Sequence, residues 1–233
     1  MLSYSHDQPV LSRRKHMKIN VRETIIRLLL LFLGLIIAHL GVTLFLLADL
    51  GADPFNVLIQ GLRLLVIKTG LSPTHGTVHM CVCFLIVIIL LFADRKYVKL
   101  GTLVCMFCGG PIIDFFTLIL QGLGISQAGL VIKIIVLVLG CGILASGMSL
   151  VIRSEAGTGP NDLVAVVISE KSGWRFSIVR IVTDVLFVLT GFLLGGKFGI
   201  GTVICAFLVG PVAERCMPVS AALVAACLKK AKN

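Results

Sequence analysis

Residues 28–48 form an apolar run, LLLLFLGLIIAHLGVTLFLLA, that contains one histidine and no side chain with a full charge. At about 1.5 Å of rise per residue, a helix of this length crosses the roughly 30 Å hydrocarbon core of a bilayer. Comparable runs recur down the chain, and 58% of its 233 residues are hydrophobic. A β-barrel would instead alternate apolar and polar residues. The sequence therefore predicts an all-α polytopic membrane protein.

The first 20 residues carry four basic side chains: Arg13, Arg14, Lys15 and Lys18. A cleaved signal peptide would have a shorter apolar region, of about 7–15 residues, that ends at small residues. We therefore expect residues 1–20 to be a basic cytoplasmic tail before an uncleaved first span. The net charge of +10 is spread over loops and tails, so it indicates membrane orientation and lipid contact and not nucleic-acid binding.

Motifs that would define an enzyme or a metal site are missing from the sequence. Cys105 and Cys108 form a CxxC pair, but they lie in an apolar run without histidines or a second pair, which favours a packing role. No phosphate-binding loop, catalytic triad, zinc-protease motif or dinucleotide fingerprint occurs. We therefore predict no enzyme, no catalytic residue, no metal and no cofactor.

Two stretches of the chain occur twice. Residues 101–114, GTLVCMFCGGPIID, are identical at six of fourteen positions to residues 201–214, GTVICAFLVGPVAE. Residues 41–57 match residues 147–163 more sparsely, with identical residues at Gly41/Gly147, Leu44/Leu150, Gly51/Gly157 and Pro54/Pro160. Because both blocks recur in the same order, we predict two homologous halves. They comprise residues 21–121 and 127–219, and a basic C-terminal tail follows at residues 220–233.

Each half contains four apolar segments, of which the second is short. The segments that begin at Pro54 and Pro160 hold 16 and 12 residues, enough for about 24 and 18 Å of helix. If they re-enter the membrane, each half has three spanning helices plus one re-entrant helix, and the halves are inverted repeats. If they span, the chain has eight spans in parallel repeats. The inverted arrangement puts 15 basic residues on the cytoplasmic side and three outside, whereas the parallel arrangement puts 13 inside and five outside. Because basic residues concentrate on the cytoplasmic side, we favour the inverted arrangement and leave the parallel one open.

Broken helices near the midplane build the substrate sites of inverted-repeat transporters. Glycine and proline precede both short segments here, at residues 51–54 and 157–160, and polar side chains surround each break. A helix that begins inside the membrane leaves N–H groups unpaired, and Asp53, Asn56 and Asp162 are placed to cap them locally. A bound anion would also suit these N–H groups. We predict a substrate site between the halves, lined by Asp53, Asn56, Thr158, Asn161 and Asp162.

Asp114 and Glu214 each follow a repeated Gly-Pro by three residues. If the proline begins a helix, such an acid lies in its first turn, where it would offset the helix dipole. Intramembrane acids are rare and usually functional, so a proton or cation site is the other interpretation, and we predict ion coupling at this pair. Asp184 follows Arg180 by four residues, a spacing that favours a salt bridge within one helix.

The blocks GADPFNV and GTGPNDL, with the late GP-[VI]-x-[DE], resemble the YczE branch of the YczE/YyaS/YitT group of bacterial integral membrane proteins. The similarity extends over nearly all of the chain beyond the basic tail. It implies a multi-pass protein of the bacterial inner membrane that is presumed to transport small molecules. It supplies no catalytic residues.

We therefore expect a small secondary transporter of a polar or anionic solute. Its expected partners are bilayer lipid and that solute, with no nucleic acid, and a homo-oligomer is compatible with the sequence. The alternative is a non-transporting membrane partner, either an assembly factor or a substrate-binding subunit of a larger importer. The sequence leaves the solute, the direction of transport and the coupling ion open.

Overall fold

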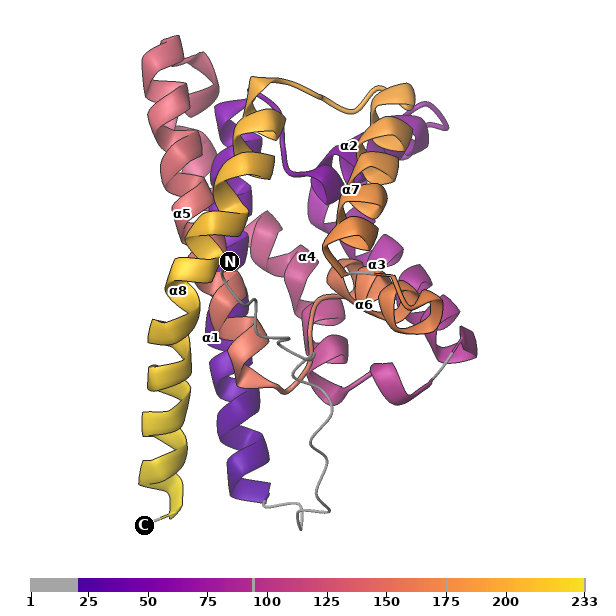
Figure 1. Ribbon diagram of the computed structural model, residues 1–233. Helices are drawn as coiled ribbons and strands as arrows, with labels where there is room; N and C mark the ends of the chain where they lie inside the picture. Colours follow the sequence, from indigo (N-terminus) through magenta and orange to yellow (C-terminus); the bar gives the residue numbers. More distant parts are fainter. Residues whose placement is uncertain (1–20, 94, 175, 233) are drawn as a thin grey trace, which may run out of the picture.

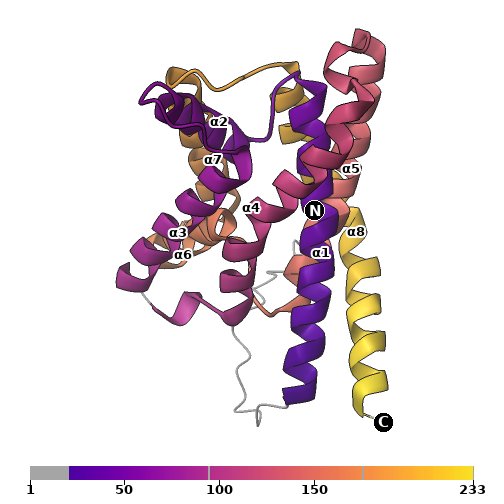
Figure 2. The ribbon, with the colours of Figure 1, turned by 180° about the vertical axis from the view of Figure 1, so that it is seen from behind.

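The computed structural model of the protein describes residues 21–93, 95–174 and 176–232, and Figures 1 and 2 show its ribbon from opposite sides. The predicted tail at residues 1–20 lies outside the described residues. Every regular element in the described residues is helical. The helices are α1 (Val21–Ala48), α2 (Pro54–Ile67), α3 (His75–Ala93), η1 (Arg95–Tyr97), α4 (Leu100–Leu120), η2 (Gln121–Leu123), η3 (Ile125–Gln127), α5 (Leu130–Ser154), α6 (Pro160–Ser172), α7 (Phe176–Leu193) and α8 (Ile200–Lys232).

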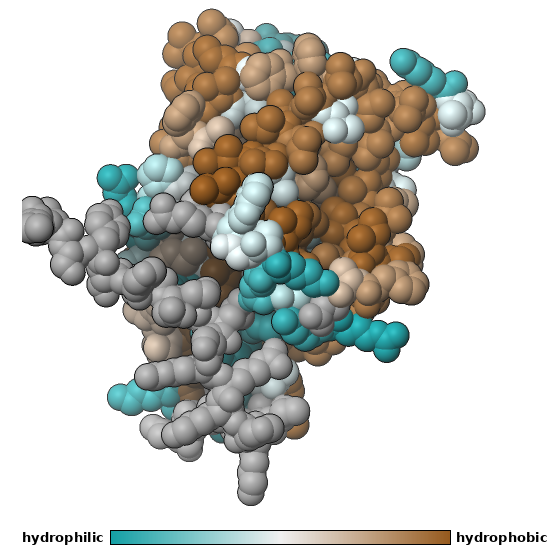
Figure 3. Space-filling view, turned by 45° about the vertical axis from the view of Figure 1, so that its right-hand side comes forward, coloured by the Kyte–Doolittle hydropathy of each residue, from teal (hydrophilic) through white to brown (hydrophobic). Residues whose placement is uncertain are grey.

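In the described residues, five helices are long and apolar enough to cross a bilayer: α1, α3, α4, α5 and α8. Large apolar side chains such as Leu29, Phe84 and Leu139 are exposed on them, and apolar surface dominates the view in Figure 3. Both features are those of an all-α polytopic membrane protein, as predicted. The helix α7 carries Arg180 and Asp184 and is not among the five, so the sixth predicted span stays a prediction.

The helices form two groups that α4 joins. α1, α5 and α8 lie together on one side, and α2, α3, α6 and α7 gather on the other (Figures 1 and 2). α4 packs against both α1 and α3. We call the end of the molecule where α1 begins the lower end, as drawn in Figure 1, and the end where α1 finishes the upper end. Within the second group, α2 lies toward the upper end and α6 toward the lower end.

Glycines allow α1 and α5 to pack backbone against backbone. Gly34 of α1 faces the backbone of Gly147, and Gly41 faces the backbone of Gly140. A Cβ atom on Gly147 would lie 2.2 Å from the backbone nitrogen of Ala38, so only glycine fits this position. As the residue number rises along α1, the number of its contact on α5 falls, and the two helices therefore run antiparallel. We call this contact the glycine seam.

Corresponding residues of the two halves make corresponding backbone contacts. The N–H of Gly101, at the start of α4, donates to the carbonyl oxygen of Ala156 at 3.1 Å. The N–H of Gly201, at the start of α8, donates to the carbonyl oxygen of Leu50 at 2.8 Å. The loop that leads into each short helix is therefore held by the other half of the chain.

The turns that follow α1 and α5 also correspond. Each contains an acidic residue in the left-handed backbone region, Asp49 with φ 55° and Glu155 with φ 57°. Each carboxylate pairs with a base, Asp49 with Lys197 at 2.6 Å and Glu155 with Arg27 at 2.9 Å. Left-handed backbone is costly for a residue with a Cβ atom, so both turns depend on the contacts around them.

The repeated Gly-Pro motifs do not mark the start of a helix. Pro111 and Pro211 lie inside α4 and α8 and do not begin helices, so Asp114 and Glu214 are not in a first turn. The helix α8 also continues through most of the segment predicted as a basic tail. The reason is apolar burial near its end, where Val224 packs in a cluster with Leu30 of α1 and Leu150 of α5.

Candidate functional site

The helix α2 begins at Pro54, and a side chain of the preceding residue caps its first turn. Asp53 Oδ1 accepts a hydrogen bond from the N–H of Asn56 at 3.3 Å, and Asp53 Oδ2 accepts one from Asn56 Nδ2 at 2.7 Å. Proline has no N–H that would need a partner in this first turn. The positive end of the α2 dipole therefore already faces an acidic side chain of the protein itself.

The helix α6 begins at Pro160 without a side-chain cap on its backbone N–H groups. Its first turn instead carries a polar pair, in which Asn161 Nδ2 donates to Asp162 Oδ1 at 3.0 Å. Asp162 Oδ1 also forms an ion pair with Arg180 Nη1 of α7 at 2.5 Å. Arg180 Nε in turn pairs with Asp184 Oδ2 at 3.0 Å, so the salt bridge predicted within α7 is present as part of a larger network.

The two short helices use corresponding positions to reach the helix that follows each of them. Asn56 Oδ1 of α2 lies 2.7 Å from His75 Nε2 of α3. Asp162, which corresponds to Asn56, reaches Arg180 of α7. We call the surroundings of the α2 and α6 N-termini the two half-sites. They share this arrangement but differ in chemistry: the α2 half-site holds an amide–imidazole pair, Asn56 with His75, and the α6 half-site holds a carboxylate–guanidinium pair, Asp162 with Arg180.

Arg180 links the two half-sites electrostatically. Its charge acts on the carboxylate of Asp53 as well as on those of Asp162 and Asp184. Asp184 and Asp53 also interact with each other. We call Asp53, Asp162, Arg180 and Asp184 the central charge cluster. It holds three carboxylates against one guanidinium, and hence an excess of negative charge when the acids are ionised.

The structure brings together four of the five predicted substrate-site residues, in two pairs: Asp53 with Asn56, and Asn161 with Asp162. The fifth, Thr158, is half-buried in the loop before α6. The sequence analysis missed Arg180 and Asp184 as site residues, because it treated them as a pair internal to α7. A basic residue within an apolar segment was the signal that could have identified them.

A second polar group surrounds His79 of α3. The ring centroids of His79 and His39 of α1 are 5.6 Å apart, edge to face, and Phe55 of α2 contacts His79 from another direction at 5.4 Å. Gly109 of α4 leaves room for both imidazoles, because a Cβ there would lie 2.9 Å from His39 Nε2 and 3.3 Å from His79 Nε2. His79 follows His75 by four residues, so polar side chains run along one face of α3 from the first turn of α2 toward α1.

The predicted ion-coupling acids have different surroundings. Asp114 Oδ1 accepts a hydrogen bond from the N–H of Gly76 at 2.9 Å, and Asp114 Oδ2 accepts one from the hydroxyl of Thr74 at 2.5 Å. Asp114 therefore caps the first turn of α3, a helix other than its own. Glu214 is exposed on α8, and the described part of the chain contains no ion pair to it. Ion coupling at this pair stays a prediction.

We expect Asp114→Ala to lower the stability of the protein by about 1 kcal/mol, the usual contribution of an N-cap acceptor. Asp114→Asn should lower it less, because the amide oxygen can still accept from Gly76. The measurement is thermal unfolding of the purified protein in detergent. Glu214→Ala is the matched control, and it should leave the midpoint unchanged. Equal midpoints for Asp114→Ala and the unaltered protein would contradict the capping role.

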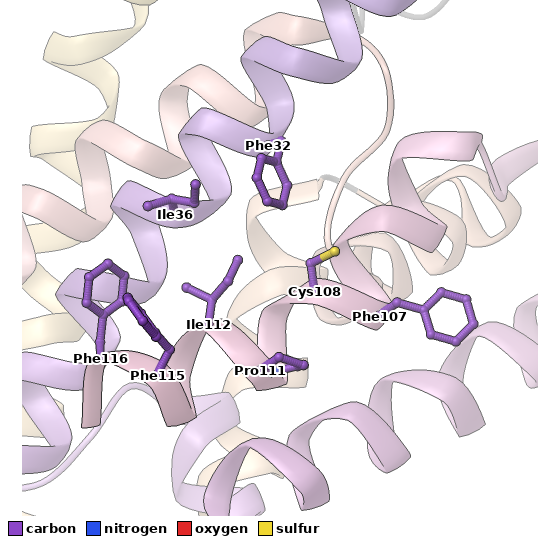
Figure 4. Close-up of a pocket in the computed structure, with 8 residues that line it drawn as sticks. All are labelled: Phe32, Ile36, Phe107, Cys108, Pro111, Ile112, Phe115 and Phe116. Atoms are coloured by element: carbon purple, nitrogen blue, oxygen red, sulfur yellow. The ribbon is translucent and has the colours of Figure 1, made fainter. Parts of the chain in front are cut away.

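Apolar grooves lined by described residues lie outside the central charge cluster. One, of about 350 Å³, lies between α1 and α4, where Figure 4 shows Phe32 and Ile36 of α1 facing Ile112 and Phe116 of α4. The other, of about 640 Å³, is lined by residues of α3, α6 and α7 that include Leu90. Both walls are mainly hydrocarbon, which suits lipid chains better than a polar solute.

The geometry defines a class: a polytopic α-helical membrane protein in which two short helices begin beside a shared cluster of charged side chains. The chain belongs to the family of unknown function DUF6198, which it matches over residues 25–218. This match, together with the relatives YczE and YyaS described next, confirms the resemblance drawn from the sequence.

The chain is similar to three bacterial proteins. It is 30% identical to the uncharacterized membrane protein YczE of Bacillus subtilis (strain 168), over 87% of this chain and 91% of YczE. It is 26% identical to the uncharacterized protein YyaS of the same organism, over 80% of this chain and 90% of YyaS. It is 29% identical to an uncharacterized protein of Haemophilus influenzae, over 79% of this chain and 80% of that protein. No solved structure matches the chain.

Proposed function

We propose that the protein is a small secondary transporter of the bacterial inner membrane, with its N-terminus in the cytoplasm and its substrate site at the central charge cluster. The observation that carries this proposal is the ion-paired network of Asp162, Arg180 and Asp184 at the start of α6, whose charge also acts on Asp53 at the start of α2. Ionisable side chains within a membrane are costly, and proteins keep them where they bind or move a charged species. The proposal includes no enzymatic activity.

The proposed topology is a pair of inverted repeats, with α2 and α6 as re-entrant helices. The antiparallel course of α1 and α5, which correspond in sequence, supports inversion. The lengths of α2 and α6, 14 and 13 residues, support re-entry, because about 20 Å of helix is shorter than the hydrocarbon core. The positions of α2 toward the upper end and of α6 toward the lower end support both the inversion of the halves and the re-entry of the short helices (Figure 1).

The charges favour a small polar solute that carries a positive charge. When all three acids are ionised, three carboxylates and one guanidinium leave negative charge that an ammonium or guanidinium group of the solute would neutralise, through charge-assisted hydrogen bonds. Asp53 already occupies the α2 N-terminus, where the sequence analysis allowed an anion. We therefore propose a cation in place of an anion.

The proposal can be tested by stabilisation and uptake with small probes. Methylammonium, guanidinium and choline should be compared with acetate and phosphate for their effect on the unfolding midpoint. We expect at least one of the cations to stabilise the protein, by about 2.7 kcal/mol at a hundred times its Kd, and the anions to have no effect. Uptake of the stabilising cation into proteoliposomes should then exceed that of protein-free vesicles.

Asp162→Asn should abolish both the stabilisation by the cation and its uptake, because it removes a carboxylate of the central charge cluster. Asp49→Asn is the matched control, since Asp49 pairs with Lys197 at the upper end and lies outside the cluster. Stabilisation by the anions alone would overturn the assignment of a cation. Stabilisation without uptake would favour the alternative from the sequence analysis, a substrate-binding subunit.

A further inference from the structure

We infer that Asp53 holds a proton when the central charge cluster is free of solute, and that the proposed solute cation displaces this proton when it binds. The inference rests on the proposed function and deepens it, because a site that exchanges a proton for a cation makes the protein an antiporter. Asp53 then takes the coupling role that the sequence analysis gave to Asp114 and Glu214.

Asp53 stands outside the ion pairs of the cluster. Arg180 Nη1 pairs with Asp162 Oδ1 at 2.5 Å, and Arg180 Nε pairs with Asp184 Oδ2 at 3.0 Å. No ion pair to Asp53 occurs in the described residues, and the charge of Arg180 acts on it only from a longer distance. Asp53 is therefore the carboxylate of the cluster whose negative charge is least compensated.

The other titratable groups around Asp53 do not pair with it. Cys141 of α5 and Cys205 of α8 lie close enough to interact with its charge, but a thiol is either neutral or negative. Asp184 of α7 adds a second negative charge. The ring of His75 of α3 hydrogen-bonds the amide oxygen in the first turn of α2, at 2.7 Å, and not the carboxylate. Without a bound cation, a proton is what remains to neutralise Asp53.

The hydrogen bonds of Asp53 leave one oxygen for the proton. Its Oδ2 accepts from Asn56 Nδ2 at 2.7 Å, whereas the contact of its Oδ1 with the N–H of Asn56 is longer, at 3.3 Å. A proton on Oδ1 forms a hydroxyl group there, while Oδ2 remains an acceptor. Asp53 lies in the loop between α1 and α2, and burial raises the pKa of its carboxyl group. The hydrogen bonds from Asn56 and the charge of Arg180 lower this pKa by less.

The proton and the cation compete for the same carboxylate. Asp162 and Asp184 already hold Arg180, so Asp53 is the carboxylate that is left to accept hydrogen bonds from the cation. With all three acids ionised, the guanidinium leaves two negative charges uncompensated, which is costly within a membrane. One proton or one monovalent cation on Asp53 removes the same single charge. The site therefore holds one or the other, and each lowers the affinity for the second.

The exchange makes and breaks no covalent bond other than O–H. The proton leaves Asp53 Oδ1 for water on the side of the membrane to which the site is open, and the cation pairs with the carboxylate that this leaves. On the opposite side the cation departs, and a proton from water binds Oδ1. One proton therefore moves against each monovalent cation, and no net charge crosses the membrane.

Infrared spectroscopy of the purified full-length protein without solute tests the proton directly, because a protonated carboxyl group has a C=O stretching band that a carboxylate lacks. At about pH 6, where carboxylates of ordinary pKa are ionised, Asp53→Asn should lose such a band. The amide keeps the N-cap of α2, so this variant should fold. Asp49→Asn is the matched control and should keep the band, since Asp49 pairs with Lys197. A band of unchanged strength in Asp53→Asn, or no band in the unaltered protein, overturns the inference.

Calorimetry tests the displacement, with whichever of methylammonium, guanidinium and choline stabilises the protein most. The dependence of the binding heat on the ionisation enthalpy of the buffer gives the number of protons released. We expect about one proton per cation, and an affinity that rises about tenfold per pH unit while Asp53 is protonated. Any binding that remains in Asp53→Asn should release no proton. Binding to the unaltered protein without proton release overturns the inference.

The infrared result is independent of transport. If the band is lost in Asp53→Asn and kept in Asp49→Asn while no probe binds, the proton on Asp53 is supported and the proposed transport of a cation fails. If a probe binds and is taken up while the unaltered protein shows no such band, the inference is overturned and the proposed function stands.

Discussion

Gly147→Leu should prevent the protein from folding into a stable form. A Cβ at this position would already lie 2.2 Å from the backbone nitrogen of Ala38 and 2.5 Å from the carbonyl oxygen of Gly34, so α1 and α5 would have to separate. Inserting bulk into a packed core costs about 1–3 kcal/mol even where side chains can shift, and here the obstacle is backbone. We therefore expect a loss of at least about 3 kcal/mol. It should appear as aggregation on size-exclusion chromatography and a lowered unfolding midpoint.

Gly142→Leu provides the matched control for this prediction. Gly142 lies on the same helix, five residues before Gly147, and a Cβ there would meet no atom within 4 Å. The helix propensity of leucine is also higher than that of glycine, so the control should be at least as stable as the unaltered protein. Wild-type stability of Gly147→Leu would show that α1 and α5 do not meet at the glycine seam.

Arg180→Met should destabilise the protein more than the removal of any one carboxylate from the central charge cluster. The substitution leaves Asp53, Asp162 and Asp184 without their common counter-charge. Breaking a fully buried ion pair costs about 3–5 kcal/mol, and because the Arg180 side chain is 31% exposed we expect a loss below that range, about 2–3 kcal/mol. Thermal unfolding in detergent at neutral pH measures this loss.

A second substitution separates the charge effect from the loss of packing. Adding Asp162→Asn to Arg180→Met should recover part of the stability, with a coupling of about 1–3 kcal/mol between the two positions. Arg63→Met is the matched control, because Arg63 bonds only the carbonyl oxygen of Pro73 among the described residues. Additive effects of Arg180→Met and Asp162→Asn would refute the ion pair as a stabilising contact.

The parts of the fold that depend on local chemistry were predictable from the sequence. Both short helices begin at the predicted prolines, Pro54 and Pro160, because proline suits the first turn of a helix and a glycine three residues earlier, Gly51 or Gly157, permits the bend. The interior position of Pro111 was not predictable by the same rule. The contacts of α4 with α1 and α3 hold that helix together across the missing hydrogen bond, and they join segments distant in the sequence.

In the candidate site, too, contacts between residues close in the sequence were predictable, and contacts between distant residues were not. The bond between Asp53 and Asn56 spans three residues, and the sequence indicated it as a local cap. The interaction of Arg180 with Asp53 joins the two halves, and no spacing along the chain predicts it. The meeting of His39 with His79 likewise depends on the tertiary approach of α1 to α3, for which the small size of Gly109 leaves the space.

The glycine seam has a consequence for where water and ions can travel. At Gly34/Gly147 and Gly41/Gly140 backbone touches backbone, so no side chain can rotate aside there and no gap can hold a water molecule. Water therefore does not pass between α1 and α5 at these contacts. If the protein transports a solute as proposed, the path would therefore lie on the far side of α1, among α2, α3, α6 and α7. The leak resistance of the membrane would then depend on how well those four helices close.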